Sequence, residues 1–255
     1  MITVTIYNEF VHEQEIDSIR KIYPQGIHGC IKSFLSSDEN LQIQTATFEM
    51  KEHGLTEEVL SKTDVLIFWS HARQEEFSDE VATRVQKHVL QGMGLITLHS
   101  AHYSKVMRRI LGTSMTLSWR DNDRERLFCC NPSHPIAKDV PIKIEIPHEE
   151  MYSEYFDIPK PDEVIFIGWF SGGEAFRSGC TFTREKGRIF YFQPGHEAYP
   201  IYYMTEIQKI IHNAVYWCSH NEAILGSSKN ILRKNIHAEV PAEVSLSLST
   251  KENLK

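Results

Sequence analysis

The segment Asp64-Val-Leu-Ile-Phe-Trp-Ser-His71 decides the fold class of this chain. Its continuous apolar run, residues 65–69, is typical of a parallel strand that is buried on both faces. The segment Gly94-Leu-Ile-Thr-Leu-His99 repeats the pattern. Between the two lies a helical pattern that opens at Ser78, a residue type favoured at helix N-caps. Strands that alternate with helices indicate βαβ units, so we expect an α/β protein with a parallel sheet covered on both faces.

The same patterns predict where the other elements lie. We expect core strands at residues 2–7, 41–48, 65–69 and 95–99, and helices at residues 27–35, 55–60, 104–111 and 202–217. After the helix that ends at residue 111, short strand-like pieces are separated by Pro and Gly instead of by helices. They predict antiparallel strands added to the parallel core, at residues 126–130, 142–146, 164–170, 175–184 and 188–192.

Composition excludes several classes of protein. The 255 residues carry a net charge of -7, without a cluster of Lys and Arg, which argues against a nucleic-acid partner. We find no apolar run near the length that spans a membrane and no signal-peptide pattern at the start. The five cysteines show no CxxC spacing, which indicates a reduced, cytoplasmic protein. We expect one domain at residues 1–220 and a weakly ordered or partner-docking tail at residues 221–255, and a homo-oligomer is compatible with this sequence.

Seven separated stretches of the sequence resemble one family. They occur in order between residues 2 and 218, and together they are similar to the ThuA, or trehalose-utilization, family. The resemblance implies a class I glutamine amidotransferase-like, flavodoxin-type doubly wound fold and a role in the use of trehalose or a related disaccharide. The stretches are Thr5-Ile-Tyr-Asn-Glu9, Tyr23-Pro-Gln-Gly-Ile-His28, Glu52-His-Gly-Leu-Thr56, residues 63–71, residues 92–100, Gly173-Glu-Ala-Phe-Arg-Ser-Gly-Cys180 and Tyr191-Phe-Gln-Pro-Gly-His-Glu197.

The nucleophile of an amidotransferase is missing from the segment that should carry it. That fold places a Cys on the elbow between a strand and a helix, whereas this segment reads Leu98-His-Ser-Ala-His-Tyr-Ser104. The chain is therefore not expected to be a glutaminase. Ser100 could take the place of the Cys, but the G-x-S-x-G pattern of serine hydrolases does not surround it.

Histidines stand at the ends of the predicted strands. Each of His71, His99, His102 and His196 could alone be a packed or capping residue. The carboxyl ends of parallel strands meet at one edge, however, so we expect these imidazoles to converge with Glu197, and with Glu9 as a weaker member. Imidazole and carboxylate groups bind Zn²⁺ or another divalent metal, or transfer protons. We assign His71, His99, His102 and His196 as metal ligands and expect no nucleotide cofactor.

A second group of polar residues lies at residues 148–155. Glu149 and Glu150 are adjacent on a predicted extended segment, so their side chains point to opposite faces. We expect Glu150 and Tyr152 to enter the site, and for Glu149 a place in a solvated acidic loop is at least as well supported as a functional role. Sugar-stacking candidates are Trp69, Trp169, Tyr152 and Tyr155, although aromatic residues more often pack in cores. Arg177 is close to Glu174 in sequence and could pair with it or bind substrate.

Two functional hypotheses follow. The first is an enzyme that acts on trehalose or an oxidised derivative, and the second is a non-catalytic sugar-binding or regulatory module on the same scaffold. The catalytic candidates are His102, His196, Glu197 and Glu150, and the substrate-binding candidates are Trp69, Ser100, Tyr152, Arg177 and Glu9. In both hypotheses the ligand is a small sugar.

Overall fold

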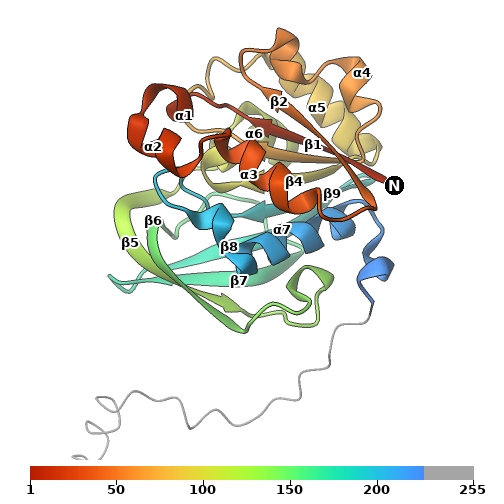
Figure 1. Cartoon of the computed structure of the whole chain (residues 1–255). Helices are drawn as coiled ribbons and strands as arrows, with labels where there is room; N and C mark the ends of the chain where they lie inside the picture. Colours follow the sequence, from red (N-terminus) through yellow and green to blue (C-terminus); the bar gives the residue numbers. More distant parts are fainter. Residues whose placement is uncertain (227–255) are drawn as a thin grey trace, which may run out of the picture.

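A single nine-stranded sheet runs through the computed structural model, which describes residues 1–226 (Figure 1). The strand order is β2-β1-β3-β4-β9-β8-β7-β5-β6. The first five are parallel and the last four continue the sheet from β9 as antiparallel neighbours. The strands are β1 (Ile2–Asn8), β2 (Leu41–Thr47), β3 (Val65–Trp69), β4 (Gly94–Leu98), β5 (Ser118–Cys129), β6 (Lys143–Ser153), β7 (Glu163–Phe170), β8 (Ala175–Arg184) and β9 (Gly187–Phe192).

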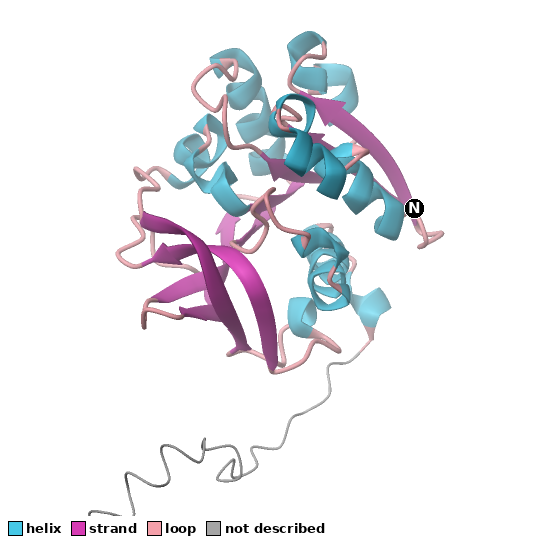
Figure 2. Ribbon diagram, turned by 60° about the vertical axis from the view of Figure 1, so that its left-hand side comes forward, coloured by secondary structure: helices cyan, strands magenta, loops and turns pink. Residues whose placement is uncertain are grey.

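Helices cover both faces of the parallel half (Figure 2). The α-helices are α1 (His12–Glu15), α2 (Asp17–Ile22), α3 (Gly26–Leu35), α4 (Glu57–Leu60), α5 (Asp79–Gln91), α6 (Lys105–Leu111) and α7 (Thr205–Cys218). Short 3-10 turns are η1 (Lys51–Gly54), η2 (His99–Tyr103), η3 (Pro135–Ala137), η4 (Ile201–Tyr203) and η5 (Glu222–Leu225). Buried residues of α3 and α7 pack on one face of the sheet, and those of α5 and α6 pack on the other.

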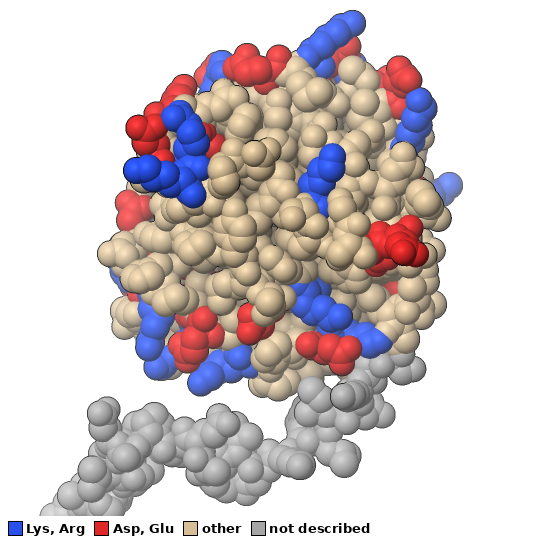
Figure 3. All heavy atoms as spheres, in the orientation of Figure 1, with Lys and Arg blue, Asp and Glu red and all other residues tan. Residues whose placement is uncertain are grey.

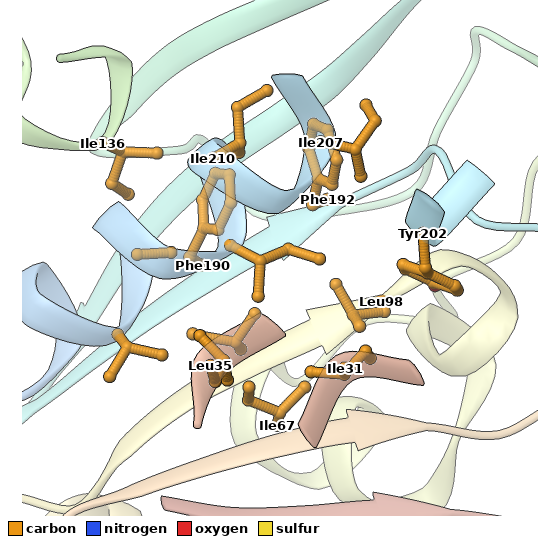
Figure 4. Packing of buried hydrophobic residues seen from close by; sticks show 14 of the residues in the cluster. Ile31, Leu35, Ile67, Leu98, Ile136, Phe190, Phe192, Tyr202, Ile207 and Ile210 are labelled. Carbon is orange, nitrogen blue, oxygen red and sulfur yellow. The ribbon is translucent and has the colours of Figure 1, made fainter. Parts of the chain in front are cut away.

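The core beneath α3 and α7 is built from aliphatic and aromatic side chains. Figure 4 shows Ile31 and Leu35 of α3 close to Ile67 and Leu98 of the strands, with Ile207 and Ile210 of α7 beside Phe190 and Phe192. Each fully buried side chain of this kind contributes roughly 1.5–3 kcal/mol relative to exposure. This packing fixes the parallel strands, and with them the loops that follow their carboxyl ends.

The central strands match the expectation from the sequence. All five residues of β3 and of β4 are buried, which agrees with their continuous apolar runs. The helix after β3 begins where Ser78 predicts, since Ser78 Oγ accepts a hydrogen bond of 3.3 Å from the backbone N–H of Val81. The predicted α/β class with added antiparallel strands is therefore confirmed.

Two features differ from the expectation. The sheet is mixed instead of mostly parallel, because its parallel pairings are matched by as many antiparallel ones. The strands β5 and β6 extend to Ser118 and Ser153, well beyond the apolar pieces that predicted them. The additional part of β5 is polar and mostly exposed, so hydrogen bonding to β6 holds it without an apolar pattern.

The surface shown in Figure 3 carries Lys and Arg interspersed with Asp and Glu, and on this face they form no single basic patch. Within residues 1–226, none of the helices has the length and apolar character needed to cross a membrane. Most of the predicted tail, residues 227–255, lies outside the described part of the chain.

Candidate functional site

Imidazoles converge where the parallel strands end. His71 follows β3, His99 follows β4 and His196 follows β9. The ring centres are 6.2 Å apart for His71 and His99, 5.6 Å for His71 and His196, and 5.3 Å for His99 and His196. The structure thus brings together three of the four histidines that sequence analysis selected, from three different loops. Together with neighbouring carboxylates they form two groups whose geometry could hold a metal ion.

The first group is His12, His71 and Glu197. Nδ1 of His12 lies 2.5 Å from Glu197 Oε1, and Nδ1 of His71 lies 2.8 Å from the same oxygen. An ionised carboxylate only accepts hydrogen bonds, so both imidazoles donate from Nδ1 and each neutral ring keeps its lone pair on Nε2. The hydrogen bond to Glu197 raises the pKa of His12 above its usual value, against the effect of partial burial.

Sequence analysis missed His12, which begins the short helix α1 after β1. The signal was present, because residues 8–12 follow the end of a parallel strand as His71 and His99 do. It was overlooked because Glu9 comes first in that loop. In the structure Glu9 shapes the next loop instead. Its carboxylate accepts hydrogen bonds from Ser70 Oγ at 2.7 Å and from the backbone N–H groups of His71 and Ala72 at 3.1 and 2.6 Å.

Glu197 has one oxygen without a hydrogen-bond partner among the described residues. Its side chain is 2% exposed, and Oε2 lies 3.7 Å from His196 Nδ1. Burial raises the pKa of this carboxyl, but the hydrogen bonds from His12 and His71 outweigh burial and hold the pKa well below its usual range. A buried, ionised oxygen that faces imidazoles and lacks a partner is suited to a cation, since leaving such a group unsatisfied is costly.

The second group is His99, Glu150 and His196. His99 is fully buried, donates from Nδ1 to the backbone carbonyl of Gln193 at 2.9 Å, and places Nε2 3.0 Å from Glu150 Oε2. Burial lowers the pKa of His99, but the ion pair with Glu150 raises it by more, to about 9. The pKa of Glu150 is lowered because its pairing with His99 outweighs burial.

His99 also occupies the strained position of the elbow between β4 and η2. Its φ of 51° lies in the left-handed region, which a residue with a side chain adopts at a cost of about 1–3 kcal/mol. Amidotransferases need their cysteine at an elbow of this kind. Here the sharp turn is present and presents an imidazole in place of a thiol.

His196 differs from the other imidazoles in its hydrogen bonding. The backbone N–H of Ala198 donates to His196 Nδ1 at 3.0 Å, so the neutral ring carries its proton on Nε2. Burial lowers the pKa of His196 to about 4, and the nearby His99 adds to the effect. His196 is therefore a neutral hydrogen-bond donor at neutral pH.

Glu149 is buried, which contradicts the expectation of a solvated acid. Its two oxygens accept hydrogen bonds from the backbone N–H groups of Gly195, Glu150 and His196, at 2.7, 2.8 and 3.1 Å. Burial raises its pKa to about 7, although these hydrogen bonds act in the opposite direction. The loop after β9 covers the face of β6 that was expected to be open, and Glu149 holds that loop in place.

A further buried acid, Glu125, lies behind the site. Ser178 Oγ is 2.9 Å from Glu125 Oε1 and 3.2 Å from Gln193 Oε1. Ser178 has one hydroxyl hydrogen to donate, and we assign it to Gln193 Oε1. A protonated Glu125 can then donate to Ser178 Oγ, which gives each of the three side chains a hydrogen-bond partner. Burial, which raises the pKa of Glu125 well above its usual value, agrees with this.

His102 does not join the other imidazoles, and its assignment as a metal ligand is corrected. Its Nδ1 donates to the backbone carbonyl of Met115 at 2.7 Å, and the ring packs among Tyr152, Phe156 and Tyr191. Burial lowers its pKa to about 3. The turn η2 places His102 apart from His99, whereas a spacing of three residues suggested that both would face one point.

Two predicted substrate-binding residues have structural partners instead. The buried Trp69 donates from Nε1 to the carbonyl of Gly195 at 3.2 Å and so supports the loop that carries His196. Arg177 pairs with Glu154 at 2.7 Å, while Glu174 pairs with Arg120 at 2.8 Å. Of the two alternatives for Arg177, a pair with Glu174 is therefore not formed.

A cavity of about 370 Å³ adjoins the two groups. Glu150, Tyr152, Ser100 and His102 line it, and Ser100 Oγ itself donates to the carbonyl of Ser70 at 2.9 Å. Two aromatic residues of its wall, Tyr103 and Trp119, were not selected from the sequence, because neither stands at a predicted strand end. The complete lining is His71, Gln74, Ser100, His102, Tyr103, Thr116, Leu117, Trp119, Glu150 and Tyr152.

Solved structures of similar fold include ThuA-like proteins. One from Parabacteroides merdae has a TM-score of 0.67 and 14% identity, over 92% of this chain and 93% of that chain. One from Bacteroides uniformis has a TM-score of 0.61 and 14% identity, over 86% and 91%. A glutamine amidotransferase from Thermotoga maritima has a TM-score of 0.50 and 9% identity, over 86% and 98%. At these identities the similarity shows the fold alone.

A search of curated proteins found no match to this sequence. The family model described as trehalose utilisation, ThuA, matches residues 3–218. This match covers the sheet except for its first residue, Ile2, and it includes both groups of imidazoles and carboxylates. The chain therefore belongs to the ThuA family.

Proposed function

We propose that this chain is an enzyme of carbohydrate metabolism that acts on trehalose or an oxidised derivative, with a divalent metal ion bound at its His/Glu site. One observation carries the proposal. Four imidazoles and two carboxylates, from strand β6 and from the segments that follow β1, β3, β4 and β9, gather beside a cavity. Core packing needs no such convergence, and the burial of so many ionisable groups is costly. The family association with trehalose utilisation supplies the substrate class.

The order β2-β1-β3-β4-β9 is that of a flavodoxin-type sheet, in which ligands bind at the switch point between the first and third strands. His12 and His71 follow those two strands. Together with Glu197 they are our candidate ligands for the metal, because imidazole nitrogen and carboxylate oxygen suit Zn²⁺. Binding of the ion would require both rings to move their proton from Nδ1 to Nε2, which would free the Nδ1 atoms that now face Glu197. Such an ion would polarise a substrate oxygen.

The pair of His99 and Glu150 is the candidate for proton transfer. Their contact of 3.0 Å joins an imidazole to a carboxylate that lines the cavity. His196 lies beside them as a neutral donor, and His102 lies in the cavity wall as a neutral imidazole. Ser100 is a bystander or a hydroxyl-binding group in this proposal, since its hydroxyl donates to a backbone carbonyl.

The second candidate function is a sugar-binding or regulatory module without turnover. It is favoured by the elbow, where His99 stands in place of the cysteine that amidotransferase chemistry requires. Both functions predict sugar binding, and only the first predicts conversion of the sugar.

Metal content is the first test. The protein is purified without a His tag, and its metals are measured by mass spectrometry for the wild type, His71→Ala and His148→Ala. His148 is exposed and lies on the same strand as Glu150, which makes it the matched control. We expect about one equivalent of metal in the wild type and in His148→Ala, and a loss in His71→Ala. Equal metal content in all three proteins would refute the metal site.

Turnover is the second test. Trehalose and oxidised derivatives are incubated with the wild type, His196→Ala and Ser100→Ala, and the products are followed by NMR. We expect His196→Ala to abolish conversion and Ser100→Ala to retain a substantial fraction. An inactive Ser100→Ala, together with labelling of the wild type by a serine-reactive probe, would point to a covalent hydrolase. Binding without conversion by the wild type would favour the module.

A further inference from the structure

The wall of the cavity combines aromatic surface with an absence of fixed positive charge. Tyr103, Trp119 and Tyr152 supply the aromatic part, and none of the lining residues is Lys or Arg. Glu150 supplies a carboxylate to the same wall. The cavity is large enough for a small ligand. The aromatic and charged side chains of its wall therefore determine which ligands it accepts.

Trp119 is the most exposed of the three aromatic residues of this wall. Its side chain is 63% exposed, whereas that of Tyr152 is 3% exposed. The two residues are directly opposite each other in the β5–β6 register, so their side chains share one face of the sheet. The arrangement places a buried phenol at the base of the cavity and an open indole at its rim. An indole left open beside polar groups suits a ligand with one apolar face, such as a sugar ring.

Three arginines close in sequence to this wall have acidic partners. Arg73, next to Gln74, pairs with Glu49 and Glu76. Arg108 stacks on Tyr103, with its guanidinium carbon 4.5 Å from the ring centre, and pairs with Glu75 at 2.5 Å. Arg120, which follows Trp119, pairs with both Glu174 and Asp123. Binding of phosphate normally uses Arg or Lys with free donors. The residues that line this cavity include no Lys or Arg, so its wall supplies no such donor.

We propose that the cavity binds an uncharged saccharide, stacked against Trp119, and discriminates against the phosphorylated form of the same sugar. This inference rests on the proposed function, because it takes a sugar as the ligand. It adds the charge class of that sugar and a specificity residue, Trp119, which lies outside the two groups of imidazoles and carboxylates.

Isothermal titration calorimetry tests the inference with matched ligands. Trehalose and trehalose 6-phosphate, and glucose and glucose 6-phosphate, are titrated into the wild type, Trp119→Ala and Trp169→Ala. Trp169 is the control, an exposed tryptophan of the same sheet that does not line the cavity. We expect the neutral sugar to bind at least about tenfold more tightly than its phosphate, and Trp119→Ala to weaken neutral binding about tenfold or more. Trp169→Ala should bind as the wild type does.

The other outcomes separate this inference from the function on which it rests. If a phosphorylated sugar binds as tightly as the neutral sugar or more tightly, and the metal is still bound, the proposed preference for an uncharged sugar is wrong and the proposed function stands. Unchanged affinity in Trp119→Ala overturns the role of that residue. If no sugar of either form binds, the inference is wrong, and if metal and turnover are also lacking, the proposed function fails with it.

Discussion

Replacement of Glu149 tests how the loop of His196 and Glu197 is held. The carboxylate accepts three backbone hydrogen bonds in a fully buried position. In Glu149→Gln the amide oxygen can keep two of them, but the amide nitrogen then faces the N–H of Gly195. One buried N–H without an acceptor costs about 1–3 kcal/mol. Glu149→Ala removes all three acceptors, and we expect a loss of roughly 3–5 kcal/mol in the free energy of unfolding.

Urea unfolding followed by circular dichroism measures these losses. The control is Glu145→Ala, since Glu145 lies on the same strand with a side chain that is 43% exposed, and we expect a change within about 0.5 kcal/mol. Metal content should fall in both Glu149 variants, because the loop that carries His196 and Glu197 is no longer fixed. The reasoning is refuted if Glu149→Ala unfolds with the free energy of the wild type.

Two further predictions concern buried charges. In the metal-free protein the pKa of His99 is raised to about 9, because its pairing with Glu150 outweighs burial. The resulting stabilisation, roughly 3 kcal/mol, is therefore present below pH 6.5 and is lost as the pH rises toward 9. Unfolding free energies across this range should show the loss in the wild type, and its persistence in Glu150→Gln would contradict the assignment. Glu125→Gln should change stability by less than about 1 kcal/mol, because an amide can donate to Ser178 as the protonated acid does, whereas Glu125→Ala should cost about 2–4 kcal/mol. Equal losses in the two Glu125 variants in urea unfolding would contradict the assignment of a protonated, donating acid.

The parallel half of the fold was predictable because strands that are buried on both faces have continuous apolar runs in their sequence. The strands β3 and β4 are covered on both faces, so every residue of their runs is shielded from water. The last two strands of the sheet, β5 and β6, lack such continuous apolar runs. Their outer parts are held by backbone hydrogen bonds and a bulged register, which polar residues support as well as apolar ones.

The candidate site was predictable to the extent that it depends on strand ends. His71, His99 and His196 each come within four residues of the end of a parallel strand, so the sheet brings the segments that carry them to one edge. Trp69 and Glu149 then hold the loop of His196. His102 lies one turn further on, where the conformation of η2 decides its direction. Glu149 was misjudged for a similar reason, since the alternation of a strand tells which face a side chain is on but not what covers that face.

The hydrogen bonds of the imidazoles separate two roles that composition alone cannot. His12 and His71 share one oxygen of Glu197, and that carboxylate keeps its second oxygen unpartnered within the described residues. His99, in contrast, is fixed by a backbone carbonyl on one side and by Glu150 on the other. A carboxylate with a spare buried oxygen suits a cation, and a closed imidazole–carboxylate pair suits a proton. Because of this contrast we place the metal at Glu197 and proton transfer at His99 and Glu150. Loss of the metal in Glu150→Gln but not in Glu197→Gln would show that the two roles are exchanged.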